Sequence, residues 1–170
     1  KIKFLKTLIF LIRVFYFCKM KLRNFLIRLS LNLYPPILFN RIVIKMISED
    51  FTSIKVILKK SIFNINFHKT IFGGSIFSAC DPFFPTMYHY IFKKSNYNLI
   101  IWVKSAEINF LKPANSSLEL NFNISKDEIE IAKRELDKND KFEAEHIVNA
   151  KDNNGVICAS ATINIYLRKK

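Results

Sequence analysis

Apolar and polar residues alternate along several stretches of this chain, which is the pattern of a β-strand with one buried face. The alternation is clearest at 118–124, where apolar residues are separated by Glu119, Asn121 and Asn123. It is equally regular at 156–168, where isoleucine, alanine and leucine occupy every second position. β-Branched residues and shorter alternations predict further strands at 42–47, 53–60, 99–111 and 142–151.

The predicted strand at 99–111 is mostly apolar, so its buried face must be chosen by position. Side chains at every second position of a strand share one face. We expect that face to contain Ile100, Trp102, Ala106, Ile108 and Phe110.

Apolar residues at helical spacing predict an amphipathic helix near the start of the chain. They are Leu22, Phe25, Leu26, Leu29 and Leu33. The helix should end before Pro35, because the residue that precedes a proline is disfavoured in the helical conformation. A short helical or irregular piece follows to about Arg41.

A second short helix is predicted from Ser125. The spacing of Ser125 and Glu128 is that of a capping box. Its expected buried stripe is Ile129, Ala132 and Leu136.

A strongly apolar helix is predicted from Gly73 to about Lys94. Pro82 and Pro85 fall within it, and each lacks the backbone N–H that a helix interior uses. We therefore expect a kink or partial unwinding beside Asp81.

The order of these elements predicts one α+β domain over residues 20–170. Strands joined by short turns, such as Asp152–Gly155, pair in an antiparallel sheet. One apolar helix among them implies a sheet wrapped around that helix. One helix cannot cover both faces and every edge of the sheet, so we expect a homo-oligomer formed through an edge or the helix end.

The net charge of +13 favours anionic partners such as phosphates, a CoA-like ligand or an acidic membrane surface. The abundance of Lys, Ile, Asn and Phe is also typical of an AT-rich coding sequence, so part of this charge needs no function. The basic residues do not gather into one basic-aromatic patch, and we expect no nucleic-acid partner. The cysteines Cys18, Cys80 and Cys158 lack metal-ligand spacing, which indicates a reducing, cytoplasmic setting without disulfides or a bound metal.

Residues 1–19 are apolar and basic and contain no acidic residue. Lys6 and Arg13 interrupt the apolar run, which falls short of the roughly 20 residues that span a membrane. Met20 opens a segment that reads like a natural start. Residues 1–19 are thus either an upstream extension or, with the helix up to residue 33, a peripheral contact to a membrane surface.

We expect the candidate catalytic and binding residues to lie between Asn66 and Asp81. Gly73 and Gly74 open the apolar helix, where backbone N–H groups lack intrahelical acceptors and a ligand can approach the main chain. Asp81 follows Gly74 by seven residues, about two turns, and returns near the same face. The amides of Gly73 and Gly74 could then stabilise a developing negative charge, and Asp81 could act as a base on the same helix. Alternatively, the glycines only allow tight packing and a partner subunit satisfies Asp81.

This spacing resembles the motif of hotdog-fold acyl-CoA thioesterases, most closely the PaaI-like branch. That motif runs Asn, five residues, His-Gly-Gly, six residues, Asp, and Asn66, Gly73, Gly74 and Asp81 match it without a gap. The segment 106–113, Ala-Glu-Ile-Asn-Phe-Leu-Lys-Pro, resembles the strand and Pro-containing turn of the family. The resemblance extends over residues 20–169.

The chain departs from that motif at two positions. Phe72 stands where the family has histidine, and the nearest histidine is His68, four residues earlier. Pro82 directly follows Asp81. The resemblance is therefore closest to a little-characterised thioesterase-like subgroup with Phe-Gly-Gly and Asp-Pro in the motif.

The resemblance implies hydrolysis of an acyl thioester, with CoA carrying the substrate and no cofactor. Asp81 would act as general base or nucleophile, and Asn66 would position water or the carbonyl. The amides of Gly73 and Gly74 would bind the oxyanion. Phe72 and His68 are candidate substrate contacts.

Further consequences of the resemblance concern CoA and assembly. Lys104 and Lys112 are the candidates for contacts to CoA phosphates. The family resemblance implies a dimer or tetramer with the site at a subunit boundary.

Two other functions fit the sequence. One is a non-catalytic acyl- or CoA-binding module in which Phe72 replaces the working histidine. The other is a membrane-surface protein that uses residues 1–33. His89 and His146 are expected to be surface or packed histidines, because neither has a patterned acidic partner.

Overall fold

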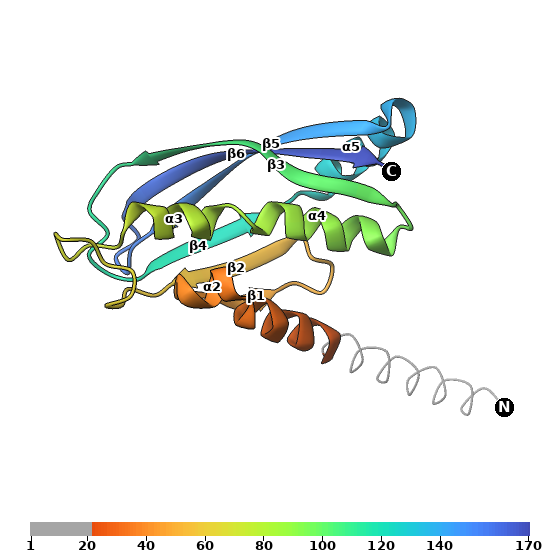
Figure 1. Cartoon of the computed structure of the whole chain (residues 1–170). Coiled ribbons are helices and arrows are strands. Elements are labelled where there is room, and N and C mark those ends of the chain that lie inside the picture. Colours follow the sequence, from red (N-terminus) through yellow and green to blue (C-terminus); the bar gives the residue numbers. More distant parts are fainter. Residues whose placement is uncertain (1–21) are drawn as a thin grey trace, which may run out of the picture.

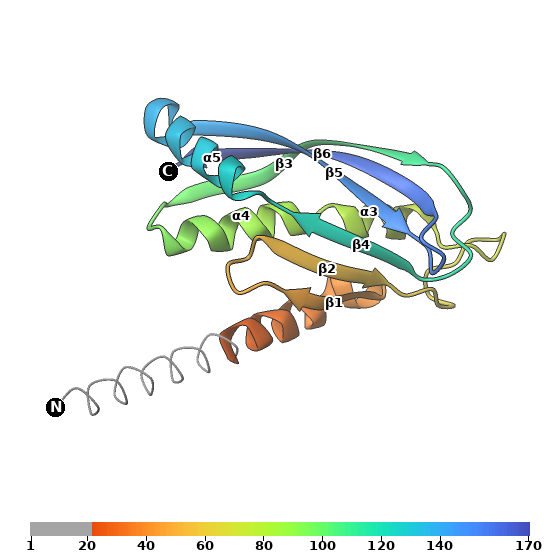
Figure 2. The same cartoon turned by 180° about the vertical axis from the view of Figure 1, so that it is seen from behind.

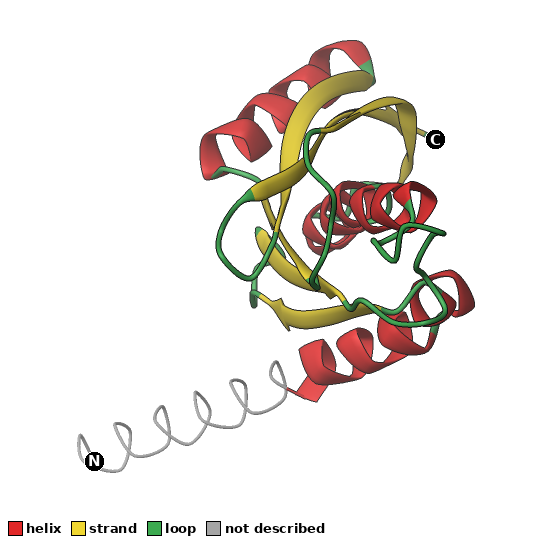
Figure 3. Ribbon diagram, turned by 90° about the vertical axis from the view of Figure 1, so that its left-hand side faces the viewer, coloured by secondary structure: helices red, strands yellow, loops and turns green. Residues whose placement is uncertain are grey.

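A computed structural model describes residues 22–170 as one antiparallel sheet of six strands with helices on both faces. The strands, in the spatial order β1-β2-β4-β5-β6-β3, are β1 (Ile42–Ile47), β2 (Ser53–Leu58), β4 (Leu118–Asn123), β5 (Lys141–Lys151), β6 (Ile157–Lys169) and β3 (Leu99–Phe110). The sheet curves around α3 (Gly73–Cys80) and α4 (Phe83–Lys94) (Figure 1, Figure 3). The predicted sheet wrapped around a central helix is confirmed.

The central helix is divided at Pro82. Asp81 caps the C-terminus of α3, where its N–H donates to the Phe77 carbonyl at 3.2 Å, and Pro82 is the N-cap of α4. Pro85 lies in the first turn of α4, where a backbone N–H has no intrahelical acceptor to lose. The break expected beside Asp81 is therefore confirmed, and it produces two helices.

The core lies between α3–α4 and the inner face of the sheet. Phe83 and Phe84 at the start of α4 pack on Phe122 of β4, with ring centroids 4.9 and 5.1 Å apart. The alternation predicted for β4 and β6 is confirmed, because the apolar set of each strand is buried. Burial of apolar surface, at about 25 cal/mol per Å², makes this layer the main source of stability.

The predicted face of β3 is wrong over its first half. The strand register shifts between Val103 and Ser105, so a β-bulge moves the alternation by one position. Ile101 and Val103 pack against the core, and Trp102 lies on the outer face against Tyr166, with ring centroids 4.8 Å apart. Ala106 and Ile108, beyond the bulge, face the core as predicted.

Helix α5 (Lys126–Asn139) covers the outer face of the sheet, opposite α3 and α4 (Figure 2, Figure 3). Its predicted cap is confirmed, because the Ser125 hydroxyl accepts a hydrogen bond from the Glu128 N–H at 3.1 Å. Beside α5, β4 and β5 pair only at Glu119–Lys151 and Leu120–Ala150. Beyond these pairs the two strands diverge, and side chains from both faces of the sheet meet there.

Residues 22–33 form the predicted N-terminal helix, and α2 (Pro35–Phe39) follows it. The helix lies along β1, and α2 contacts both β1 and α3 (Figure 1, Figure 3). The predicted extension at residues 1–19 lies outside the described residues. Between residues 22 and 170, no helix has the length and apolar character needed to cross a membrane.

Candidate functional site

The N-terminus of α3 leaves two backbone N–H groups available. Phe72 is the N-cap, in extended conformation, and its carbonyl accepts hydrogen bonds from the N–H groups of Ser75 (3.0 Å) and Ile76 (3.2 Å). Among the described residues, the N–H groups of Gly73 and Gly74 have no backbone acceptor. These are the first donors of a helix, which have none within it. The two amides can therefore bind an external oxygen.

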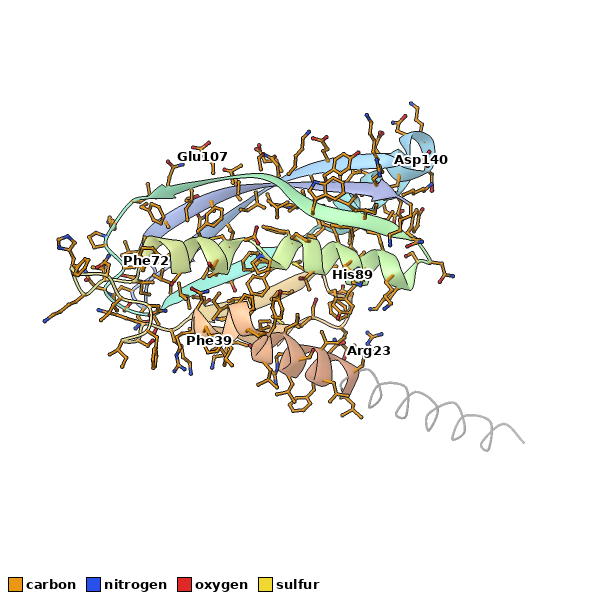
Figure 4. The ribbon with its side chains drawn as sticks, in the orientation of Figure 1. Arg23, Phe39, Phe72, His89, Glu107 and Asp140 are labelled. Carbon is orange, nitrogen blue, oxygen red and sulfur yellow. The ribbon has the colours of Figure 1, made fainter. Side chains whose placement is uncertain are left out.

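Aromatic rings lie close against both glycines in the first turn of α3. A Cβ on Gly73 would lie 3.0 Å from Cζ of Phe110, and one on Gly74 would lie 2.4 Å from Cε1 of Phe72. Figure 4 shows Phe72 at the start of the helix. The glycine pair thus has a packing role in addition to leaving its amides accessible.

Asn66 holds the loop that precedes α3. Its Oδ1 accepts hydrogen bonds from the N–H groups of His68 (2.9 Å) and Thr70 (3.2 Å), and its Nδ2 donates to the Thr70 hydroxyl at 2.8 Å. Such a side chain mimics a backbone turn. In this structure the polar atoms of Asn66 are engaged within the loop, so its direct effect is to shape the loop.

Asn64 is a positioning residue that the sequence interpretation missed. Its side chain is buried, accepts a hydrogen bond from the Ser61 N–H at 2.9 Å, and donates to the carbonyls of Asn40 (3.1 Å) and Lys59 (2.9 Å). Its own carbonyl accepts from the Phe72 N–H at 2.8 Å. Asn64 therefore fixes the N-cap of α3 to the end of β2. The one signal in the sequence is Asn three residues after Ser, a common local turn pattern.

An open pocket of about 500 Å³ lies at this end of α3. Four of the predicted site residues line it: Asn66, His68, Gly73 and Lys112. The rest of its lining is largely apolar and comes from residues 70–76 and 110–114. The Ile71 N–H donates to the Ala114 carbonyl at 3.0 Å, which holds these two walls together. An apolar cavity with a few polar groups at one end is typical of a small-molecule site.

Asp81 does not line this pocket. It lies at the other end of α3, and seven residues of helix separate it from Gly74 by about 10 Å along the axis. Partial burial raises the pKa of the Asp81 carboxyl, which is the direction that a general base needs. One copy of the chain therefore does not bring the carboxylate to the amides of Gly73 and Gly74.

The neighbouring thiol is a poor nucleophile. Burial and the Asp81 carboxylate raise the pKa of Cys80 to about 12, so it stays protonated at neutral pH. Cys158 is also buried and free. Over residues 22–170, no three His, Cys, Asp or Glu side chains gather as a metal site would require.

The remaining candidates lie elsewhere. Lys104 is on β3, is exposed and pairs with Glu143 at 2.8 Å. His146 is a packed histidine, stacked on Phe84 with ring centroids 4.1 Å apart. It is packed, as predicted, but it also has an acidic partner in the fold, because its Nε2 lies 3.1 Å from Oε1 of Glu128. That partner comes from α5, so no local spacing could indicate it.

Comparison with known proteins identifies a family and a fold. Residues 23–167 match the family described as domain of unknown function DUF4442. Among curated proteins, none matches the sequence.

Solved structures resemble the chain over most of its length. A protein of unknown function from Chlorobaculum tepidum has a TM-score of 0.70 at 14% identity, over 82% of this chain and 89% of that one. The PaaI protein from the phenylacetic acid degradation operon of Escherichia coli has 0.60 at 13%, over 89% and 94%. Thioesterase HI1161 of Haemophilus influenzae has 0.60 at 9%, over 82% and 87%. The chain shares its fold, the hotdog fold that the motif implied, with these solved structures.

Proposed function

This chain belongs to the DUF4442 family, and from its hotdog fold and the pocket at the start of α3 we propose that it hydrolyses an acyl thioester. The observation that carries the proposal is that, within residues 22–170, the amides of Gly73 and Gly74 lack a backbone acceptor at the end of α3 where Gly73 lines the pocket. Backbone donors at a helix N-terminus stabilise negative charge on an oxygen. A thioester carbonyl bound there would be polarised toward attack.

Asp81 supplies the base in this proposal. The carboxylate takes a proton from water, the oxygen of that water bonds to the thioester carbon, and the amides hold the resulting oxyanion. Collapse of the tetrahedral intermediate breaks the carbon–sulfur bond, and the thiolate leaves and is protonated. The products are a carboxylic acid and a free thiol.

The base comes from a second copy of the chain. The length of α3 keeps Asp81 away from the amides of its own chain, as described above. The outer edge of β3 is unpaired among the described residues, because β3 ends the sheet. Antiparallel pairing of two β3 strands about a two-fold axis would also set the two central helices antiparallel. Each Asp81 would then approach the pocket of its partner, and the site would lie at the subunit boundary.

CoA is the proposed carrier of the acyl group. Lys112 lines the pocket, and its ammonium can pair with a phosphate. The apolar walls of the pocket suit the acyl group or the pantetheine arm. Lys104 is a weaker candidate, since Glu143 already neutralises it.

The test is a panel of short, long and aromatic acyl-CoA esters, assayed by release of free thiol. Cleavage of at least one ester is expected, and Asp81→Asn should reduce kcat by about a hundredfold or more. Asp127→Asn, which changes an exposed carboxylate at the start of α5, is the matched control and should leave turnover unchanged. Full turnover in Asp81→Asn would remove that residue from the mechanism.

A non-catalytic acyl-CoA-binding module is the second candidate. This function is favoured by Phe72 at the N-cap of α3, because phenylalanine cannot ionise where the family motif has histidine. This function predicts that an acyl-CoA raises the melting temperature while no ester in the panel is cleaved.

A further inference from the structure

The helix at residues 22–33 turns three polar side chains toward β1, beside Ile27 and Leu31, which pack against the core. Asn24, Arg28 and Asn32 recur every four residues, so they share one face of the helix. Each of them hydrogen-bonds to the main chain at or just after the outer edge of β1. The bonds join Asn24 to the Ser48 carbonyl (3.2 Å), Arg28 to the Lys45 carbonyl (2.7 Å), and Asn32 to the Ile44 carbonyl (3.2 Å) and N–H (2.7 Å).

These bonds explain why polar residues face inward. β1 ends the sheet, and an edge strand presents backbone groups that need partners. Asparagine amides and a guanidinium supply those partners, where leucine side chains could not. A helix on the surface of a globular protein ordinarily buries its apolar stripe. Here only Ile27 and Leu31 of the apolar residues at 22–33 pack against the core, and the larger apolar set of the helix stays exposed.

The apolar side of the helix consequently faces outward. Its members, which we call the N-terminal stripe, are Leu22, Phe25, Leu26, Leu29 and Leu33. Each of these side chains is between 44% and 60% exposed. Phe39 of α2, at 74% exposed, extends the apolar surface beyond the helix. Figure 4 labels Arg23 and Phe39 at the two ends of this helical region.

Two hollows flank the junction of the helix and β1. Their volumes are about 280 and 270 Å³, and Phe25 and Arg28 line both. Met46 and the acidic Glu49 also line the first hollow, and Val43 lines the second. The guanidinium of Arg28 lies 5.7 Å from the centroid of the Phe25 ring. Cationic and apolar groups therefore stand side by side along the helix.

Basic residues dominate the charge of this end of the chain, and Glu49 and Asp50 are its first acidic residues. The first 48 residues contain ten Lys and Arg and no Asp or Glu, so they carry ten of the net thirteen positive charges. Residues 1–21, which lead directly into the helix, have the same apolar and basic composition. The N-terminal stripe therefore fits a partner with an apolar interior and a negatively charged surface.

We propose that the N-terminal stripe docks on the surface of a bilayer that contains anionic lipids. Leucine and phenylalanine side chains enter the acyl region, and the exposed Arg23 contacts lipid phosphates, as in other interfacial helices. A second copy of the chain is a poor occupant, because the same basic segment would face itself. This inference is independent of the proposed hydrolysis.

The experiment is flotation of the full chain with two kinds of vesicle, phosphatidylcholine alone and phosphatidylcholine mixed with phosphatidylserine. The protein should float with the mixed vesicles, much less with phosphatidylcholine alone, and less in high salt. The variant Leu26→Gln/Leu29→Gln/Leu33→Gln should bind the mixed vesicles at least about tenfold more weakly. The substituted side chains are exposed, so an unchanged thermal melt is expected to accompany the loss.

A matched control changes exposed apolar residues elsewhere. Ile62→Gln/Phe63→Gln/Ile147→Gln should bind vesicles like the unsubstituted chain. The proposal is overturned if the unsubstituted chain stays soluble with mixed vesicles, or if the Leu26/Leu29/Leu33 variant floats as well as it does. Light scattering adds a further contradiction: if that variant loses a dimer that the unsubstituted chain forms, the stripe is an interface between copies.

Discussion

Nε2 of His146 lies 3.1 Å from Oε1 of Glu128, at the place where β4 and β5 diverge. Tyr88, from α4 on the inner face, also donates its hydroxyl to this carboxylate, and its oxygen lies 3.2 Å from the same imidazole nitrogen. Glu128 comes from α5 on the outer face. The three side chains therefore join the two helical layers through the opening in the sheet.

Glu128→Gln should destabilise the protein at neutral pH. Burial raises the pKa of Glu128, but the hydrogen bonds from His146 and Tyr88 outweigh burial and hold it below its usual value. The stabilisation is therefore full above the unfolded-state pKa, near 4.3, and is lost as pH falls through the lower folded-state pKa.

Urea unfolding provides the measurement for this pair. We expect Glu128→Gln to lower the free energy of unfolding by about 1–3 kcal/mol at pH 7 and by less below pH 4. Glu130→Gln, on the same helix, breaks only an exposed pair with Lys133 and should cost about 0.5 kcal/mol or less. Equal losses in the two variants would contradict a special role for Glu128.

Asp81→Asn should stabilise the isolated chain while it removes activity. The pKa of Asp81 is raised by burial, so the native state disfavours its charged form, and that penalty operates above the unfolded-state pKa near 3.9. The melting temperature of the variant should exceed that of the unsubstituted chain at pH 7. The difference should vanish as pH falls below both pKa values.

The same raised pKa sets the pH dependence of hydrolysis. As a general base, Asp81 works only when deprotonated, so kcat/KM should fall as pH drops through its raised pKa. The acid limb should thus lie above the ordinary pKa of aspartate, near 3.9. A rate that stays constant down to pH 4 would show that another group acts as the base.

Two inactive variants should restore activity when they are refolded together. Asp81→Asn lacks the base, and Gly73→Val fills the pocket wall and displaces the Phe110 ring. If each site combines Gly73 of one chain with Asp81 of the other, a mixed dimer contains one intact site. Random pairing should then return roughly a quarter of the original activity. A site built within one chain gives no recovery at all.

Lys112→Ala should raise KM for acyl-CoA with little change in kcat. The loss of one ammonium–phosphate pair at an open site costs about 1 kcal/mol, roughly fivefold in affinity. Lys104→Ala removes an exposed lysine that pairs with Glu143, and it should raise KM less than Lys112→Ala does. The effect of Lys112→Ala should shrink in high salt, and a free acyl-pantetheine substrate should not show it.

Sequence patterns correctly predicted the helices and strands that depend only on neighbouring residues. Alternation identified β4 and β6, and Ser125 with Glu128 marked the start of α5 because the cap involves only neighbouring residues. The face of β3 was wrong at Trp102 because a bulge inserts one residue, and no glycine or proline marks that bulge in the sequence. The His146–Glu128 pair depends on how two distant elements pack, which periodicity does not contain.

The candidate site was only partly predictable for the same reason. Spacing placed Gly73 and Asn66 at one pocket, since both belong to one turn and the helix after it. It also suggested that Gly74 and Asp81 act together, because it counted rotation around the helix and not the rise along it. Asn64 was missed because its partners, Asn40 and Lys59, come from other parts of the chain.

The two edge strands of the sheet differ in whether their outer backbone groups are covered, and this difference limits how copies of the chain can associate. At β1, side chains of the N-terminal helix occupy backbone groups that an incoming strand would need. At β3, the outer backbone groups have no such cover among the described residues. Sheets with two open edges can add strands without end and grow into fibres. With one edge sealed, strand addition at β3 would end after a single partner, and the chain would form a closed assembly in place of a filament.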